Sequence, residues 1–242
     1  MKECVDRYNS GQISPSLLAR SAGILYLFTV VAGFFGLAFV HGSLVVEGDP
    51  SVTATNILAH EPLFRIGTFS VLAGTLCYVA VTALLYVLLA PIGRSLSITA
   101  ALFSVAGCAI WGVGCVFDLA ALSVIKTEQS GTTAMVLLGL NGQAFRVGML
   151  FFAVYCSLIG YLIFASGFFP RILGVLVMGA GVGHLLSMGA GILAPTSTRF
   201  LFPYIMVPGA IGEPALTLWL LVMGVNAAKW NEIARTAPPF LH

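Results

Sequence analysis

Six apolar runs, each long enough to cross a lipid bilayer, dominate this sequence. A helix needs about 20 apolar residues to span the hydrocarbon core of a membrane. Only 8% of the residues are charged, whereas a soluble domain carries about 25%. The sequence therefore predicts an all-α, polytopic membrane bundle of six transmembrane helices. The predicted spans occupy residues 21–40, 66–92, 97–125, 145–168, 172–194 and 204–226.

The cationic residues predict the orientation of these spans, which place both termini on one side. The positive-inside rule assigns the side richer in Lys and Arg to the cytoplasm. We therefore expect a multi-pass protein of the cell inner (plasma) membrane, with residues 1–20 and 228–242 cytoplasmic and residues 21–227 forming the transmembrane domain. The terminal side holds Lys2, Arg7, Arg20, Arg94, Arg171, Lys229 and Arg235, and the outer side holds Arg65, Lys126, Arg146 and Arg199.

The connections between the spans differ on the two sides. Tight turns with Pro and Gly are expected on the inner side, at residues 91–95 and 167–171. On the outer side, Asp49 and Pro50 predict the start of a short helix that ends near His60. Residues 126–142 predict a second outer segment, in which residues 134–140 are apolar enough to dip into the head groups.

Glu213 lies deep within the last apolar run and is the most informative polar residue. A carboxylate there costs about 2.5–3.5 kcal/mol on insertion scales unless it faces protein or water. Pro214 lacks an N–H, so the Ala210 carbonyl loses its helical partner nearby. Pro208 and Pro214 predict an interrupted last helix. Glu213 could carry a proton as an acid–base group, or remain protonated and bond to the freed carbonyl.

Three further ionisable residues are expected in the outer half of the membrane or near its middle. Asp118 and Arg146 are the obvious charge pair, either as a structural bridge or as a binding site for a substrate. His184 is expected to be a structural histidine or a proton relay to Glu213. Asp118, Arg146, His184 and Glu213 are therefore the polar-site candidates.

The outer rim supplies a second group of candidates, for which interfacial hydrogen bonding is the expected role. They are His41, Asp49, His60, Glu61 and Arg65. No H-E-x-x-H or C-x-x-C spacing occurs, so we predict no metal and no cofactor. No G-x-S-x-G motif occurs either, and the signal for a hydrolase is weak.

Several short motifs resemble a bacterial family of six-span membrane proteins, catalogued as domain of unknown function 4386. The resemblance implies a six-helix integral membrane fold and no activity, cofactor or catalytic residue. The motifs are A-R-S-A-G-I-L-Y-L at 19–27, G-D-P at 48–50, N-I-L-A-H-E-P-L-F-R at 56–65, G-Y-L-I-F-A-S-G at 160–167, P-R-I-L-G at 170–174, G-E-P at 212–214 and L-W-L-L at 218–221.

Three classes of function stay open at this point. The first is proton-coupled binding or transport of a small molecule at Glu213 and His184. The second is a membrane-embedded enzyme that acts on a lipid-like substrate, with Asp118, His184 and Glu213 as acid–base groups. The third is an accessory or scaffold subunit that receives a membrane-protein partner. The lipid bilayer is a partner in each case, and a net charge of +2 gives no indication of nucleic-acid binding.

Overall fold

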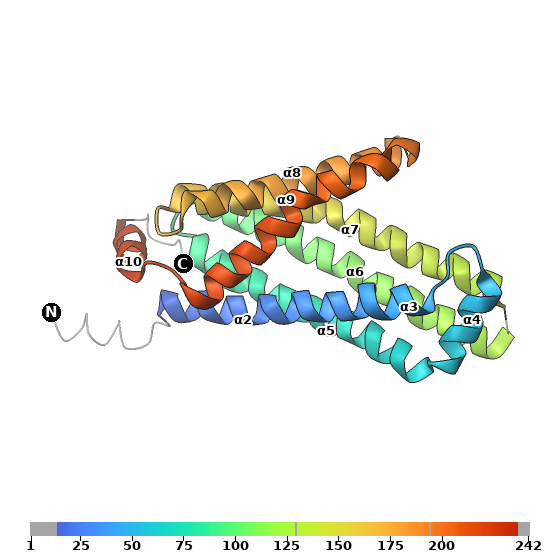
Figure 1. Cartoon of the computed structure of the whole chain (residues 1–242). Coiled ribbons are helices and arrows are strands. Elements are labelled where there is room, and N and C mark those ends of the chain that lie inside the picture. The colour runs from blue at the N-terminus through green and yellow to red at the C-terminus, as the bar shows by residue number, and fades with distance from the viewer. Residues whose placement is uncertain (1–13, 129, 194, 237–242) are drawn as a thin grey trace.

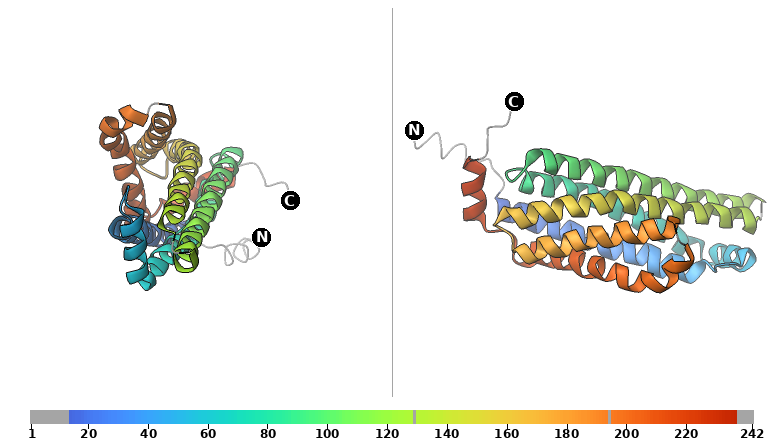
Figure 2. Two further views of the ribbon diagram at one scale, coloured as in Figure 1. Left: turned by 90° about the vertical axis from the view of Figure 1, so that its right-hand side faces the viewer. Right: turned by 90° about the horizontal axis from the view of Figure 1, so that it is seen from above.

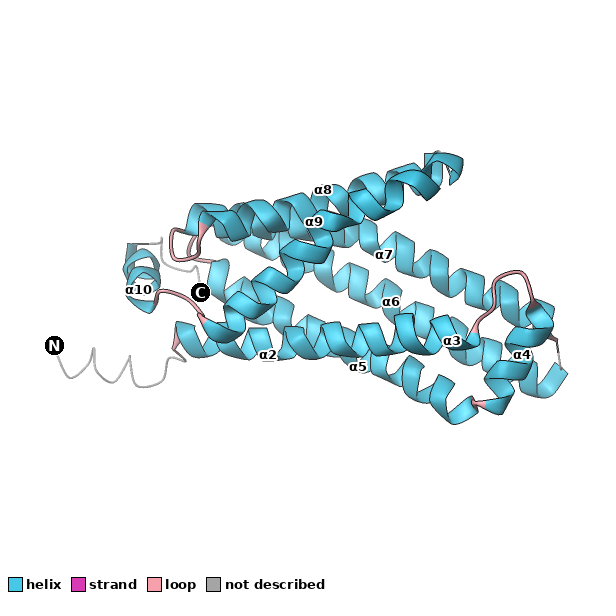
Figure 3. Ribbon diagram, in the orientation of Figure 1, coloured by secondary structure: helices cyan, strands magenta, loops and turns pink. Residues whose placement is uncertain are grey.

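The computed structural model describes residues 14–128, 130–193 and 195–236, and the side chains of these residues except 128, 190–206 and 208. The described residues form helices joined by short turns, with no strand among them (Figures 1 and 3). The helices are α2 (Pro15–Gly33), η1 (Phe34–His41), α3 (Gly42–Leu44), α4 (Pro50–Ala59), α5 (Glu61–Leu89), α6 (Arg94–Glu128), α7 (Gly131–Ser166), α8 (Arg171–Leu193), α9 (Pro195–Val222) and α10 (Ala227–Thr236).

The all-α polytopic bundle predicted from the sequence is confirmed, with five to six candidate spans among the described residues. Five helices are long and apolar enough to cross a membrane: the continuous segment Pro15–Leu44, α5, α6, α7 and α8. A sixth span results when the part of α9 from Gly209 is counted together with α10, across a bend of 98°. Over its whole length α9 has 28 residues, which at about 1.5 Å per residue exceeds the thickness of the hydrocarbon core.

The six long helices close into a ring. Each packs against the next in chain order from α2, α5, α6, α7 and α8 to α9, and α9 packs back against α2. Figure 2 shows this bundle along its axis (left) and from the side (right). We call the end with the start of α2, the two tight turns and α10 the proximal end. The end with α3 and α4 is the distal end (Figure 1).

Glycines let α9 pack backbone-to-backbone against both of its neighbours. A Cβ atom at Gly23 of α2 would lie only 2.6 Å from the Leu221 nitrogen of α9. A Cβ atom at Gly212 of α9 would lie 2.6 Å from the Leu176 carbonyl oxygen of α8. Small residues allow helices to associate closely where lipid removes the hydrophobic drive. Glu213 follows Gly212 directly, so these contacts fix its position in the bundle.

The proximal connections follow the sequence prediction. α5 ends at Leu89 and α6 begins at Arg94, while α7 ends at Ser166 and α8 begins at Arg171. Gly167 follows α7 with a φ of 67°, a left-handed conformation that favours glycine.

Part of the predicted C-terminal tail forms α10. Trp230 anchors this helix to the bundle, because its Nε1 donates to the Leu88 carbonyl oxygen at 2.8 Å.

At the distal end, one predicted connection is confirmed and one is wrong. Asp49 caps α4 by accepting a hydrogen bond from the Val52 nitrogen at 3.0 Å, as expected. Residues 126–142 do not form a separate outer segment, because α6 continues to Glu128 and α7 already begins at Gly131. This extension of α7 packs against α6 and α4. Its residues Ala134 and Leu138 are buried in a distal core instead of dipping into head groups.

The prediction of an interrupted last span is also wrong. α9 is one continuous α-helix from Pro195 to Val222, and both Pro208 and Pro214 lie inside it. A transmembrane helix tolerates proline when its neighbours hold the chain in place and satisfy freed backbone groups. The close packing of α9 between α2 and α8 supplies that support.

Candidate functional site

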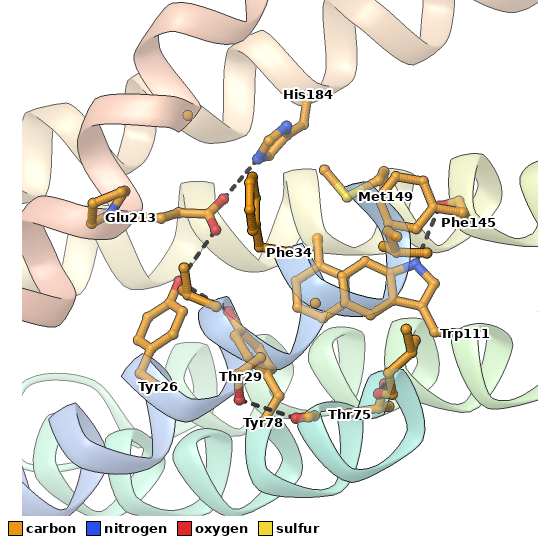
Figure 4. Close-up of a pocket in the computed structure, with 18 of the residues that line it drawn as sticks. Tyr26, Thr29, Phe34, Thr75, Tyr78, Trp111, Phe145, Met149, His184 and Glu213 are labelled. Atoms are coloured by element: carbon orange, nitrogen blue, oxygen red, sulfur yellow. Dashed lines mark hydrogen bonds and ion pairs between the residues drawn. The ribbon is translucent and has the colours of Figure 1, made fainter. Parts of the chain in front are cut away.

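A cavity of about 410 Å³ lies inside the ring of helices. Its volume falls in the range of sites for small molecules, which is about 300–1,000 Å³. All six long helices and η1 contribute to its lining, which is mostly apolar (Figure 4). The two lining residues that can carry a charge other than tyrosine and cysteine, His184 of α8 and Glu213 of α9, face each other on one side.

His184 and Glu213 form a hydrogen-bonded pair, the partnership that the sequence left open. His184 Nε2 lies 2.8 Å from Glu213 Oε1, and the two side chains are 7% and 30% exposed. The local sequence makes room for the ring: Gly209 lies one turn before Glu213, and a Cβ atom there would be 2.9 Å from His184 Cε1. His184 is therefore fixed against α9, while Glu213 remains accessible from the cavity.

Two tyrosines extend this pair into a chain of four side chains from four helices. Tyr26 of α2 donates its hydroxyl to Glu213 Oε2 at 3.4 Å. Tyr78 of α5 donates to the Tyr26 hydroxyl, also at 3.4 Å. These distances are long for O–H···O hydrogen bonds, so Tyr26 holds Glu213 loosely and is itself held loosely by Tyr78. Figure 4 shows the chain along one side of the cavity.

The hydrogen-bond pattern indicates the tautomer of His184. Its Nδ1 is buried and has no partner among the described residues. An N–H at this position would be an unsatisfied donor, which costs about 1–3 kcal/mol and more when charged. The neutral imidazole with its hydrogen on Nε2 leaves an unpaired acceptor at Nδ1 in place of an unpaired N–H or an unpaired charge. In that state Nε2 donates to Glu213 Oε1, and His184 brings no positive charge to the pair.

Aromatic side chains form the opposite wall of the cavity. Trp111 stacks on Phe145 and on Phe152, with ring centroids 5.4 Å and 4.4 Å apart. The Trp111 Nε1 donates to the Phe145 carbonyl oxygen at 3.2 Å. The Thr29 hydroxyl, which also lines the cavity, donates to the carbonyl oxygens of Leu25 and Gly74. These donors are already used by the backbone, so Glu213 is the main polar group that a ligand would meet.

The cavity has a mouth on the side of the bundle. Phe34, Val30 and Ala210 line it, yet Phe34 is 70% and Val30 is 39% exposed on the bundle surface, and Ala210 is also exposed. A residue that both lines a cavity and reaches the surface lies at its opening. Phe34 belongs to η1 and Ala210 to α9, so the mouth lies between these two segments. In a membrane this side faces the lipid.

The helix beside this mouth departs from regular α-geometry. η1 is a π-helix of 8 residues, from Phe34 to His41. π-Helical turns are rare and are frequent at functional sites. Phe34 and Leu37 of η1 both line the cavity. Gly36 packs it closely on α5, since a Cβ atom at Gly36 would lie 2.7 Å from the Gly67 carbonyl oxygen. Nothing in the sequence of residues 34–41 indicated this element.

Asp118 belongs to a second polar cluster, and its predicted pair with Arg146 does not form. Asp118 accepts hydrogen bonds from His41 Nε2 at 3.1 Å and from Asn141 Nδ2. Arg146 is exposed and makes no ion pair with a described residue. The reason is helical geometry: at about 100° per residue, Arg146 points some 140° away from Asn141 around α7. Asn141 also lines the cavity, so this cluster stands behind its distal wall.

The remaining rim candidates do not converge on one site. Asp49 caps α4, and His60 Nδ1 donates to the Asn56 carbonyl oxygen at 3.2 Å. Glu61 bonds Arg65 Nε at 2.8 Å and Lys126 Nζ at 3.0 Å. Within the described part of the chain, no three His, Cys, Asp or Glu residues lie close enough to hold a metal ion. Cys4 and the side chain of Arg199 lie outside the described residues.

Comparison with known proteins supports the resemblance seen in the motifs. The family model of DUF4386, a domain of unknown function, matches residues 21–224. The chain belongs to this family. It is also similar to an uncharacterized protein of the archaeon Archaeoglobus fulgidus, with 26% identity over 165 residues, which cover 65% of this chain and 82% of that protein. No solved structure matches.

In this DUF4386 protein, two of the motifs that carry the resemblance meet at the site. Tyr26 lies in the motif at residues 19–27, and Glu213 lies in the motif at 212–214, 187 positions away from Tyr26. That pair of motifs is the one signal that could have indicated Tyr26. Nothing in the sequence indicated Tyr78 or Trp111, because aromatic residues within apolar runs are common in packed cores.

Proposed function

We propose that this protein binds a small lipophilic molecule in its central cavity and that protonation of Glu213 is coupled to binding or transport. The observation that carries the proposal is the His184–Glu213 pair, whose carboxylate is 30% exposed and opens onto an otherwise apolar cavity. An ionisable group within a membrane is expensive and is usually functional. A carboxylate that served packing alone would be closed off and fully bonded.

The position of the mouth supports entry from the bilayer. The mouth lies between η1 and α9, on a side of the bundle where the surrounding side chains are apolar and exposed. A molecule dissolved in lipid can enter there without crossing water. The same mouth favours a second candidate function, an enzyme that acts on a lipid-like substrate with Glu213 as its acid or base. Binding or transport is the simpler proposal, because it needs only the groups already found in the cavity.

The orientation of the protein follows from the same cationic residues as in the sequence. We infer that the proximal end faces the cytoplasm of a cell inner (plasma) membrane, with both termini on that side. Arg94 and Arg171 begin helices at this end, and α10 carries Lys229 and Arg235. The positive-inside rule supports this orientation. At about 1.5 Å per residue, Glu213 then lies roughly 14 Å from the proximal end of α9, close to mid-membrane.

A photoreactive probe tests whether the cavity is occupied from the bilayer. A long-chain alcohol that carries a diazirine is incorporated into membranes containing the protein and is activated by light. We expect cross-links to concentrate on inner cavity residues such as Trp111 and Phe145, and to fall at least severalfold in A210F, which narrows the mouth. V113F places the same side chain at an exposed position of α6 that does not line the cavity, and should leave the pattern unchanged. Cross-links spread evenly over the lipid-facing surface would contradict the proposal.

A further inference from the structure

We propose that the cavity selects a lipophilic cation, and that this cation exchanges with a proton on Glu213. The proposal rests on the binding function proposed above and adds the chemical class of the ligand.

The cavity lining carries little charge. Among the described residues that line it, Glu213 is the only Asp or Glu, His184 is the only basic residue, and Lys and Arg are absent. Arg146, the cation expected nearby, is exposed and points away. An anionic ligand would therefore meet a carboxylate and no counter-charge, whereas a cation would find an acceptor.

The charge of the His184–Glu213 pair also favours a cation. The unpartnered Nδ1 of His184 favours a neutral ring that donates from Nε2 to Oε1. The pair then has no internal positive charge, and an ionised carboxylate without a counter-charge is unfavourable in an apolar site. A proton or a bound cation would each relieve this cost. Oε1 is engaged with His184, so Oε2, which is held only by the long bond from Tyr26, is the exchanging oxygen.

The exchange balances without any other reactant. A protonated Glu213 releases the proton of its carboxylic acid as the cation enters, and the carboxylate pairs with the cation. When the cation leaves, the carboxylate takes up a proton again. Since one group serves both partners, the proton and the cation exclude each other. The factor by which a bound proton lowers the affinity for the cation equals the factor by which a bound cation lowers the affinity for the proton.

The aromatic residues of the cavity also favour a cation. Trp111 and Phe145 stand across the cavity from Glu213, and Phe34 lies between them and the carboxylate in Figure 4. Aromatic rings attract organic cations through their quadrupole, most strongly where water is excluded. An aromatic wall with a single carboxylate suits an apolar cation such as a substituted ammonium ion. A neutral lipid would use the wall but gain little from Glu213.

The groups that face Glu213 allow it to act as the exchanging acid. They are His184 from α8 and Tyr26 from α2, with Tyr78 from α5 behind Tyr26. From α7, Tyr155 and Cys156 lie in electrostatic range of this tyrosine–glutamate cluster. None of these groups is a Lys or Arg, and tyrosines and thiols are ordinarily neutral near pH 7. Because an imidazole can gain a proton between pH 5 and 8, the pH dependence of cation binding is assigned to Glu213 by its loss in E213Q.

Three probes of similar shape and different charge test the proposal with the full-length protein in lipid nanodiscs. The cation is phenylpropyl trimethylammonium, the neutral probe has a tert-butyl group in place of the trimethylammonium group, and the anion is phenylbutyrate. We expect the cation to bind at least about tenfold more tightly than the neutral probe, and the anion not to bind, given the cost of an unpaired buried charge. In the range where Glu213 holds its proton, cation affinity should fall about tenfold for each unit of decrease in pH, with about one proton released per cation bound.

Variants complete the test. E213Q should lose the preference for the cation and the proton release, while E213D, which keeps the charge, should retain both in part. E61Q makes the same substitution at the exposed rim and should behave as the unaltered protein. Equal binding of the cation and the neutral probe, or cation binding unchanged in E213Q, would overturn the cation proposal while leaving the cavity function intact. Failure of all three probes to bind, together with failure of the alcohol cross-links described above, would instead remove the binding function itself.

Discussion

Two histidine–carboxylate pairs occur among the described residues of the helix bundle, and they differ in which partner is buried. In the distal pair, Asp118 is only 3% exposed and His41 is 20% exposed. In the central pair, the carboxylate is the accessible partner: Glu213 is 30% exposed and His184 is 7% exposed. Asp118 accepts from both His41 and Asn141, whereas Glu213 has one short bond and one long one. The comparison separates a carboxylate that holds helices together from one that is free to meet a ligand.

Loss of the distal carboxylate should have the largest effect on stability. D118A removes the acceptor shared by His41 and Asn141 and leaves the Asn141 amide buried without its partner. Breaking a buried charged network costs about 3 kcal/mol, and we expect D118A to lower the free energy of unfolding by about that amount. Denaturant titration in mild detergent checks this. E213Q should cost much less, and a larger loss in E213Q than in D118A would contradict the distinction between the two pairs.

The second largest effect is expected from displacing His184, the histidine of the central pair. In G209V, the new side chain would begin 2.9 Å from His184 Cε1 and would force the ring out of its place against α9. We expect cation binding to weaken about tenfold, because His184 no longer donates to Glu213 and that lost charge-assisted bond is worth about 1.5 kcal/mol. Equilibrium dialysis of phenylpropyl trimethylammonium measures this change. G139V tests the same substitution on a helical glycine with open space around it, and should leave binding as it is.

Removal of the Tyr26 hydroxyl should weaken cation binding less than G209V does. Y26F deletes only the long bond to Glu213 Oε2 and preserves the packing of the ring on Tyr78. A weak hydrogen bond of this kind is worth roughly 0.5 kcal/mol, so cation affinity should fall about two- to threefold. The same dialysis measurement applies. A loss as large as that of E213Q would mean that Tyr26 contacts the ligand directly.

Replacement of Glu61, the carboxylate at the distal rim, should have the smallest effect on stability and on cation binding. Glu61 bonds Arg65 and Lys126 on the surface of the distal end, and exposed ion pairs contribute little to stability. E61Q should therefore change neither the unfolding curve nor cation binding. A clear effect of E61Q on binding would show that the distal surface communicates with the cavity, and would weaken the use of this variant as a control.

The sequence predicted the spans, the proximal turns and the Asp49 cap well, because each depends on local chemistry. Long apolar runs have one stable form in a membrane, and Pro, Gly and Asp mark helix ends directly. The same local logic failed where neighbouring helices decide. The extension of α7 to Gly131 and the continuity of α9 through Pro208 and Pro214 depend on packing partners that no single segment contains.

The site was only half predictable for a related reason. Glu213 and His184 could be found because charged and basic groups are rare in apolar runs. Their partners Tyr26 and Tyr78, and the partner His41 of Asp118, depend on the rotation and register of adjacent helices. Lipid-facing and core-facing residues are both apolar in a membrane protein. Hydropathy therefore does not show which face of a span turns inward, and Arg146 was assigned to the wrong side of its helix.

Reaction with a carbodiimide measures the accessibility of the two membrane carboxylates directly. A lipid-soluble carbodiimide, such as dicyclohexylcarbodiimide, modifies protonated carboxyl groups that it can reach from the bilayer, and mass spectrometry locates the adduct. We predict modification of Glu213 and not of Asp118, with protection of Glu213 by phenylpropyl trimethylammonium. Modification of Asp118 in preference to Glu213, or no modification of Glu213 at any pH, would contradict an open central site.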